Sequence, residues 1–119
     1  MTKPKGKPYN LEQRTLEFSK STINLCKKLI KGQLNYRLVD QLIRSATSVG
    51  ANYREANEAL SKKDFAHRMK ITRKECKEAS YWFEIIKEAN AEHADEINNL
   101  LKESQELRNI FTAIIEKTK

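Results

Sequence analysis

Residues 61–89 have the sequence SKKDFAHRMKITRKECKEASYWFEIIKEA, and this stretch decides the fold class of the chain. Ser61 is followed three residues later by Asp64, a capping-box pattern that predicts the start of a helix. Behind this pattern, apolar and small residues return every three or four positions, at Phe65, Met69, Thr72, Cys76, Ala79, Phe83 and Ile86. This spacing predicts one amphipathic helix that continues to about Ala89.

The same helical periodicity continues toward the N-terminus. Asn10 and Gln13 form another capping-box pattern, which predicts the start of a helix over Leu11–Lys31. Gly32 is the kind of residue that ends a helix, and Asn35 can cap the helix that follows. The sequence therefore predicts two helices before residue 61.

A fourth helix follows on the C-terminal side. Residues 90–94 predict a short turn, and the last helix starts at Asp95 or its neighbour and ends with the chain. Helices joined by such short connections must alternate in direction. We therefore expect an all-α, antiparallel up-down-up-down four-helix bundle over residues 10–119, preceded by a disordered basic arm at residues 1–9. The pattern does not rank the possible packing arrangements, and it leaves the handedness of the bundle open.

Gly50 lies inside the second predicted helix. A glycine in a helix interior costs about 1 kcal/mol relative to alanine. Its presence therefore predicts that a neighbouring helix or side chain occupies the space that a methyl group would fill. We expect one added methyl group at this position to disturb the packing.

The composition limits the class of protein. No apolar run approaches the length of roughly 18 to 20 residues that spans a bilayer, so no membrane association is expected. Cys26 and Cys76 are too few and too far apart for a disulfide framework or a zinc site, which favours reduced core thiols in a cytoplasmic protein. The 23 basic and 16 acidic residues give a net charge of +7, an excess that favours polyanionic partners.

Catalytic and metal-binding patterns are missing from the sequence. A di-metal site in a bundle needs Glu-x-x-His pairs, and the nearest match is Asp64 with His67, while His93 falls in a predicted turn. Both histidines are expected to face solvent. Glu75 and Glu78 could form an acid-base pair, but the lysines beside them favour surface ion pairs. We expect no enzyme activity, cofactor, metal or small-molecule substrate.

A basic row is predicted on the helix over residues 61–89. At about 100° per residue, its lysines gather on the side opposite the apolar stripe, with an arginine beside them. Such a row suits a phosphate backbone, although a solvated face with ion pairs explains it equally well. The candidate nucleic-acid-binding residues, with those of the first helix, are Lys20, Lys27, Lys28, Lys31, Lys63, Lys70, Arg73, Lys74 and Lys77.

A second apolar flank lies between the core stripe and the basic row. Tyr81, Trp82 and Phe83 are consecutive, so they cannot all point inward from one helix. Aromatic anchors are enriched at protein interfaces, which favours a subunit contact over cover from the same chain. The candidate oligomer-interface residues are Ile71, Glu78, Tyr81, Trp82 and Ile85.

Two segments carry a family resemblance. The run Gln41–Ala56, QLIRSATSVGANYREA, and the run Lys74–Trp82, KECKEASYW, are similar to bacterial four-helix-bundle proteins encoded in intervening sequences of large-subunit ribosomal RNA genes. Carried over by position, the residues that match are Arg44, Ser45, Ser48, Gly50, Asn52 and Glu55 in the first segment and Glu75, Glu78, Tyr81 and Trp82 in the second. The resemblance implies roles in packing and assembly for these residues.

The same resemblance implies a ring-like homopentamer without known enzymatic activity. Accessory proteins of diversity-generating retroelements are similar in fold and act with a reverse transcriptase and nucleic acid, which supports RNA binding by analogy. The leading hypothesis is a non-enzymatic homo-oligomer that binds RNA or a ribonucleoprotein through its basic surface. The alternative is a protein scaffold or adaptor without nucleic-acid binding, for which the Trp82 flank matters and the lysines do not.

Overall fold

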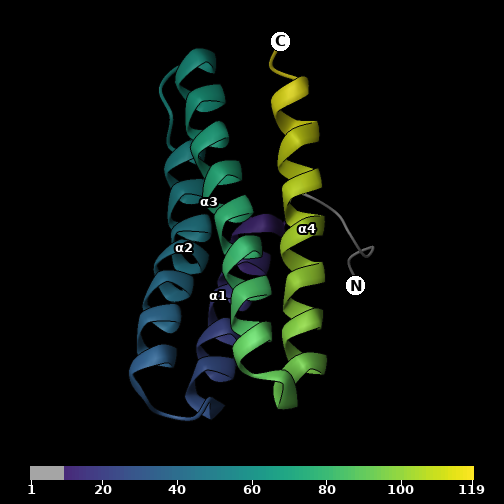
Figure 1. The fold of residues 1–119 in the computed structure, drawn as a ribbon. Coiled ribbons are helices and arrows are strands. Elements are labelled where there is room, and N and C mark those ends of the chain that lie inside the picture. Colours follow the sequence, from purple (N-terminus) through teal and green to yellow (C-terminus); the bar gives the residue numbers. More distant parts are fainter. Residues whose placement is uncertain (1–9) are drawn as a thin grey trace, which may run out of the picture.

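The computed structural model describes residues 10–119, which form four packed helices and no strand within that range (Figure 1). The helices are α1 (Leu11–Lys28), α2 (Gln33–Asn57), α3 (Lys62–Ala89) and α4 (Ala94–Glu116), with a short 3-10 turn, η2 (Ala91–His93), before α4. The predicted all-α, up-down-up-down bundle is confirmed. The predicted arm at residues 1–9 lies outside the described residues. Between residues 10 and 119, no helix is both long and apolar enough to cross a membrane.

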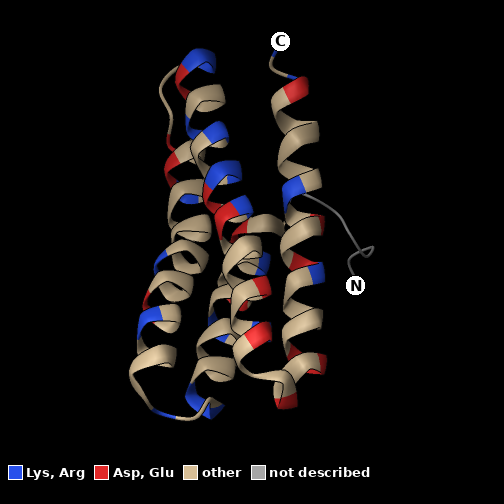
Figure 2. Cartoon of the chain, viewed as in Figure 1, with Lys and Arg blue, Asp and Glu red and all other residues tan. Residues whose placement is uncertain are grey.

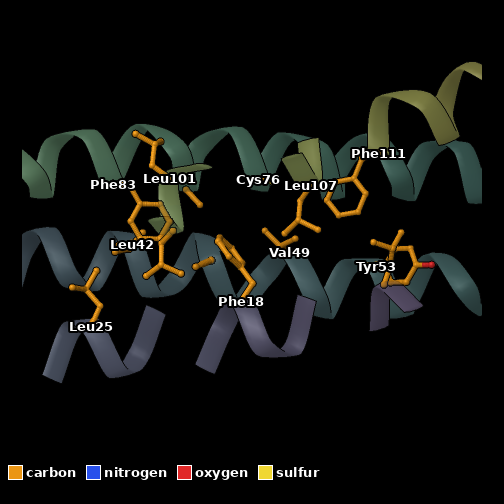
Figure 3. Close-up of a cluster of buried hydrophobic side chains, with 14 of the residues drawn as sticks. Phe18, Leu25, Leu42, Val49, Tyr53, Cys76, Phe83, Leu101, Leu107 and Phe111 are labelled. Atoms are coloured by element: carbon orange, nitrogen blue, oxygen red, sulfur yellow. The ribbon is translucent and has the colours of Figure 1, made fainter. Parts of the chain in front are cut away.

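Each helix packs mainly on the helices next to it in sequence, and α1 also contacts α4. The helices α1 and α3 therefore lie on a diagonal, and their inner faces meet across the core. Phe18 of α1 and Phe83 of α3 make an edge-to-face contact with ring centroids 6.0 Å apart. Figure 3 shows the two rings among buried side chains of the other helices, such as Leu42 and Leu101. The seam predicted for α3 is buried at all positions except Phe65, which is half-buried.

The helix α1 is the shortest of the four and lies beside only the lower part of its neighbours (Figure 1). It ends at Lys28 rather than at the predicted Lys31, because Leu29 is extended with φ −74° and ψ 148°. Leu29 stays buried while the chain turns through Ile30, Lys31 and Gly32 into α2. The bulk of the upper end therefore comes from α2, α3 and α4.

Of the three predicted N-terminal caps, one is confirmed. The Ser61 hydroxyl accepts a 3.0 Å hydrogen bond from the backbone N–H of Asp64. Asn10 makes no side-chain cap bond, so its predicted capping role is wrong. The cap predicted at Asn35 is also wrong, because α2 begins at Gln33 and Asn35 lies within its first turn.

The Asn35 side chain instead forms a tertiary contact at the lower end of the bundle. Its amide group exchanges two 2.9 Å hydrogen bonds with the side chain of Asn90, one in each direction. Asn35 also donates to the Ile30 carbonyl at 2.7 Å, and Asn90 donates to the Ile86 carbonyl at 3.0 Å. With Asn90 only 1% exposed, this amide pair ties the α1–α2 connection to the end of α3.

Gly50 is buried where α2 passes α1, which confirms the predicted close approach. A Cβ atom at this position would lie 3.1 Å from Oγ1 and 3.4 Å from Cβ of Thr15. The Thr15 hydroxyl is buried and donates to the Leu11 carbonyl at 2.7 Å, so it has little freedom to move aside. Glycine is therefore required here by space rather than by backbone conformation.

The two cysteines differ in burial. Cys76 is fully buried and its thiol donates to the Ser104 carbonyl at 3.0 Å, whereas Cys26 is half-buried at the edge of the core. Burial raises the pKa of the Cys76 thiol to about 12 and that of Cys26 to about 11, because it disfavours the thiolate. The prediction of a core position holds fully for Cys76 and in part for Cys26.

Candidate nucleic-acid interface

The N-terminal half of α3 carries the strongest concentration of positive charge in Figure 2. We call its four exposed lysines, which lie on the side opposite the core, the lysine row: Lys63, Lys70, Lys74 and Lys77. Within residues 10–119 none of these four ammonium groups forms an ion pair. The lysine row therefore presents its charge to solvent without an acidic partner bound to it.

Negative charge takes over in the second half of the same helix (Figure 2). Glu84 and Glu88 follow the lysine row on α3, and Glu92 and Asp95 lie just beyond the end of α3. The nearer acids, Glu75 and Glu78, are paired with Arg44 of α2 and so are turned toward that helix. The α3 surface is thus divided into a basic upper half and an acidic lower half.

A shallow depression lies at the start of α3, beside the lysine row. Its volume is about 590 Å³, and it is formed where the first two turns of α3 approach the end of the chain after α4. The residues that line it are Lys62, Lys63, Ala66, His67, Lys70, Thr118 and Lys119. His67 is exposed here as predicted, whereas His93, also predicted to face solvent, is half-buried. The depression extends the positive surface from α3 toward the C-terminal tail.

The structure does not join the lysines of α1 to the lysine row. Lys27, Lys28 and Lys31 lie at the lower end of the bundle, and α1 is diagonal to α3 (Figures 1 and 2). Lys28 pairs with Glu96 at 2.9 Å, and Lys31 lines a depression that also includes Glu92. Lys20 lies 3.9 Å from Glu17 on the same helix. The lysines predicted as one candidate set therefore form two separate groups, of which the α1 group has acids beside it.

Arg73 also departs from its predicted place beside the lysine row. Its side chain is half-buried and its guanidinium donates to the Thr112 hydroxyl of α4 at 3.4 Å. On the helix, position 73 lies nearer to the α4 contact than the four lysines do. Arg73 therefore contributes to the α3–α4 contact as well as to the local charge.

The two segments that carry the family resemblance meet at the α2–α3 contact. The Arg44 guanidinium of α2 donates to Glu75 and to Glu78 of α3, and the indole N–H of Trp82 lies 3.4 Å from the Glu78 carboxylate. Arg44 lowers the pKa of the Glu78 carboxyl below its ordinary value through this hydrogen bond. Residues far apart in sequence thus form one polar network on the outside of the bundle.

The other residues of the first resembling segment stabilise α2 and its contacts. Ser45 and Ser48 donate to backbone carbonyls one turn earlier in α2, and Asn52 donates to the Ser48 carbonyl at 2.9 Å. Glu55 reaches Arg68 of α3 at 3.6 Å. With Gly50 against Thr15, these contacts give the segment a packing role in this chain.

The predicted apolar flank of α3 is only partly covered. Ile71, Trp82 and Ile85 are half-buried, as is Glu78, and Trp82 packs against the edge of the core. Phe83 is fully buried, whereas Tyr81 remains 57% exposed. This confirms that the three consecutive rings cannot all point inward. Whether the flank forms a subunit interface stays a prediction.

An apolar groove that the sequence did not indicate lies on the outside of α1 and α2. It has a volume of about 230 Å³ and is lined mainly by apolar side chains. Ile30 and Tyr36, at its rim, are 70% and 60% exposed, and Leu34 between them in sequence is 61% exposed. The groove was missed because it depends on the extended connection between α1 and α2, which the periodicity placed inside a helix.

Comparisons with known proteins agree with the geometry. A family model described as 23S rRNA-intervening sequence protein matches residues 8–113. A crystal structure of a protein of unknown function from the S23 ribosomal protein family of Bacteroides thetaiotaomicron is similar, with a TM-score of 0.80 and 33% sequence identity. That similarity covers 87% of this chain and 96% of the other. No curated protein matches the chain.

Proposed function

The chain belongs to the family of 23S rRNA-intervening sequence proteins, and from this premise we propose that it is a non-enzymatic cytoplasmic protein that binds RNA or a ribonucleoprotein through the lysine row of α3. The observation that carries the proposal is the set of four exposed lysines on one helix face, none held by an acid within the described residues. A row of free ammonium groups attracts a polyanion along its whole length.

The physical basis is the release of counterions from the RNA backbone. Each lysine that neutralises a phosphate releases condensed cations, which adds affinity that does not depend on base sequence. Lys77 lies fourteen positions after Lys63, which is about 21 Å along the helix axis. This length is enough for several phosphates of one strand to be contacted together. The acids of the lower half limit the contact to the upper half.

The test is a titration of fluorescein-labelled oligouridylate of about 16 nucleotides, followed by fluorescence anisotropy at several salt concentrations. The affinity should fall steeply between about 50 and about 200 mM salt. In the variant Lys70→Gln/Lys74→Gln/Lys77→Gln, the affinity at low salt should fall by about ten-fold or more. The slope of log Kd against log salt should decrease by about one for each phosphate that a lysine no longer neutralises.

The chain offers a charge-matched control on α1. The variant Lys20→Gln/Lys27→Gln/Lys31→Gln removes the same charge from positions away from the lysine row. It should keep most of the affinity if the site is local to α3. Equal losses in the two triple variants would show that overall charge, and not this site, binds RNA. A wild-type affinity that does not change with salt would contradict the proposal as a whole.

The proposal includes self-assembly. The apolar groove between α1 and α2, with Ile30 and Tyr36 exposed at its rim, supports it, since exposed apolar surface of this kind is typical of protein interfaces. The half-covered flank around Trp82 offers a second surface of the same chemistry. A homopentamer is the assembly that the resemblance implies.

Light scattering tests this part of the proposal. The mass should be several times the 13.9 kDa of one chain, and Tyr36→Asp should lower it, because a carboxylate would be buried in an apolar contact. A wild-type monomer at micromolar concentration would contradict self-assembly. The alternative of a scaffold or adaptor gains support if Trp82→Ala abolishes partner capture while the lysine variants leave it intact.

A further inference from the structure

We propose that Tyr81 extends the lysine row as a stacking platform for an unpaired RNA base, so that the site takes single-stranded RNA. This inference rests on the proposed function and specifies its ligand. It also gives Tyr81 a role different from the interface role predicted from the sequence. The position of the ring on α3, its exposure and the charges around it support this role.

Tyr81 lies on the same helix face as the four lysines. Along α3, the successive intervals from Lys63 to Lys70, Lys74, Lys77 and Tyr81 are seven, four, three and four residues. These intervals keep side chains on one face of a helix, because an α-helix has 3.6 residues per turn. Tyr81 is one turn beyond Lys77, about 6 Å farther along the axis. The ring is therefore the next side chain in the row.

The ring is available to a ligand. The side chain is 57% exposed, and its hydroxyl makes no hydrogen bond to any residue in the range 10–119. Trp82 meets the ring in an edge-to-face contact, with centroids 5.1 Å apart and an interplanar angle of 78°. An exposed aromatic ring supported in this way can stack on a nucleic-acid base, whatever the identity of the base.

The charges on either side of Tyr81 decide which part of an RNA strand fits there. Lys74 and Lys77 lie before the ring, while Glu84 and Glu88 follow it. Phosphates are attracted to the lysines and repelled by the glutamates, so the backbone must leave the α3 surface near Tyr81. An uncharged base is the group that can occupy this boundary. Bases in a duplex are already stacked and paired, so only an unpaired base can be placed on the ring.

The test compares Tyr81→Ala and Tyr81→Phe with wild type on two probes. One probe is the oligouridylate used above, and the other is a blunt RNA duplex of similar length. Tyr81→Ala should weaken binding of the single strand by at least about five-fold, with the salt slope unchanged, because stacking involves no counterion release. Tyr81→Phe should bind like wild type, and the duplex affinity should be the same in all three proteins.

A second readout comes from Trp82, the only tryptophan in the chain. Because its ring lies beside Tyr81, the single strand should change the tryptophan emission more than the duplex does. The inference is overturned if Tyr81→Ala binds the single strand like wild type, or if it loses binding only together with a fall in the mass measured by light scattering. A wild-type affinity independent of salt would instead remove the proposed function itself, so the two failures are distinguishable.

Discussion

Replacing Phe83 with alanine is expected to lower the free energy of unfolding by about 3 to 5 kcal/mol. Phe83 is fully buried in α3 and contacts Phe18 of the diagonal helix α1. Its removal would leave a cavity at the centre of the bundle, where four helices must move together to close it. A domain of this size is stable by only about 5 to 15 kcal/mol, so a large part of its stability depends on this one ring.

Chemical denaturation followed by circular dichroism measures the effect. The midpoint should fall while the m-value stays near that of wild type, at equal protein concentration because assembly would add to the stability. Phe83→Leu should lose much less, since it keeps most of the buried volume. Tyr81→Ala, two positions away on the exposed face, should cost about 1 kcal/mol or less. Equal losses at positions 81 and 83 would contradict the orientation of α3.

Replacing Asn90 with alanine is expected to cost about 2 to 4 kcal/mol, a large effect for a residue outside the helices. The change removes the two hydrogen bonds with Asn35 and the bond to the Ile86 carbonyl, all in a site where Asn90 is 1% exposed. Each polar group left buried without a partner costs about 1 to 3 kcal/mol. Because the position is closed to bulk solvent, the groups that Asn90 leaves behind stay without a partner.

A double-mutant cycle with Asn35→Ala separates the pair from its surroundings. The loss in the double variant should be smaller than the sum of the two single losses, by about 0.5 to 3 kcal/mol, because the second change removes a group that already lacks its partner. Asn99→Ala is the matched control, since Asn99 is exposed on α4 and should change stability by about 0.5 kcal/mol or less. Additive losses at positions 35 and 90 would show that the amide pair is not coupled.

The sequence was sufficient for the helices and their order, because each has an apolar stripe of helical period. It also located Gly50 correctly, since a glycine inside a helix has few explanations other than close packing. It failed at Asn10 and Asn35, where a local capping preference was the only signal available. Asn35 is used instead in a contact with Asn90, 55 positions away in the chain. No local pattern contains that information.

The candidate site was predictable in composition but not in arrangement. The lysine row follows from helical geometry alone, because its four members lie on one helix. The position of the α1 lysines relative to that row depends on which helices are adjacent and where α1 ends, and neither was fixed by the periodicity. The network of Arg44 with Glu75 and Glu78 likewise joins two helices. Its charges were visible, but their partners were not.

The connectivity of the bundle has a consequence for how the chain is made. Nearly all helix contacts join neighbours in sequence, with α1 and α4 as the one distant pair in substantial contact among the described helices. Such a low contact order favours folding in roughly microseconds to milliseconds. During synthesis, the hairpin of α2 and α3 can therefore close before α4 has been translated, and α4 then adds to a nearly finished surface.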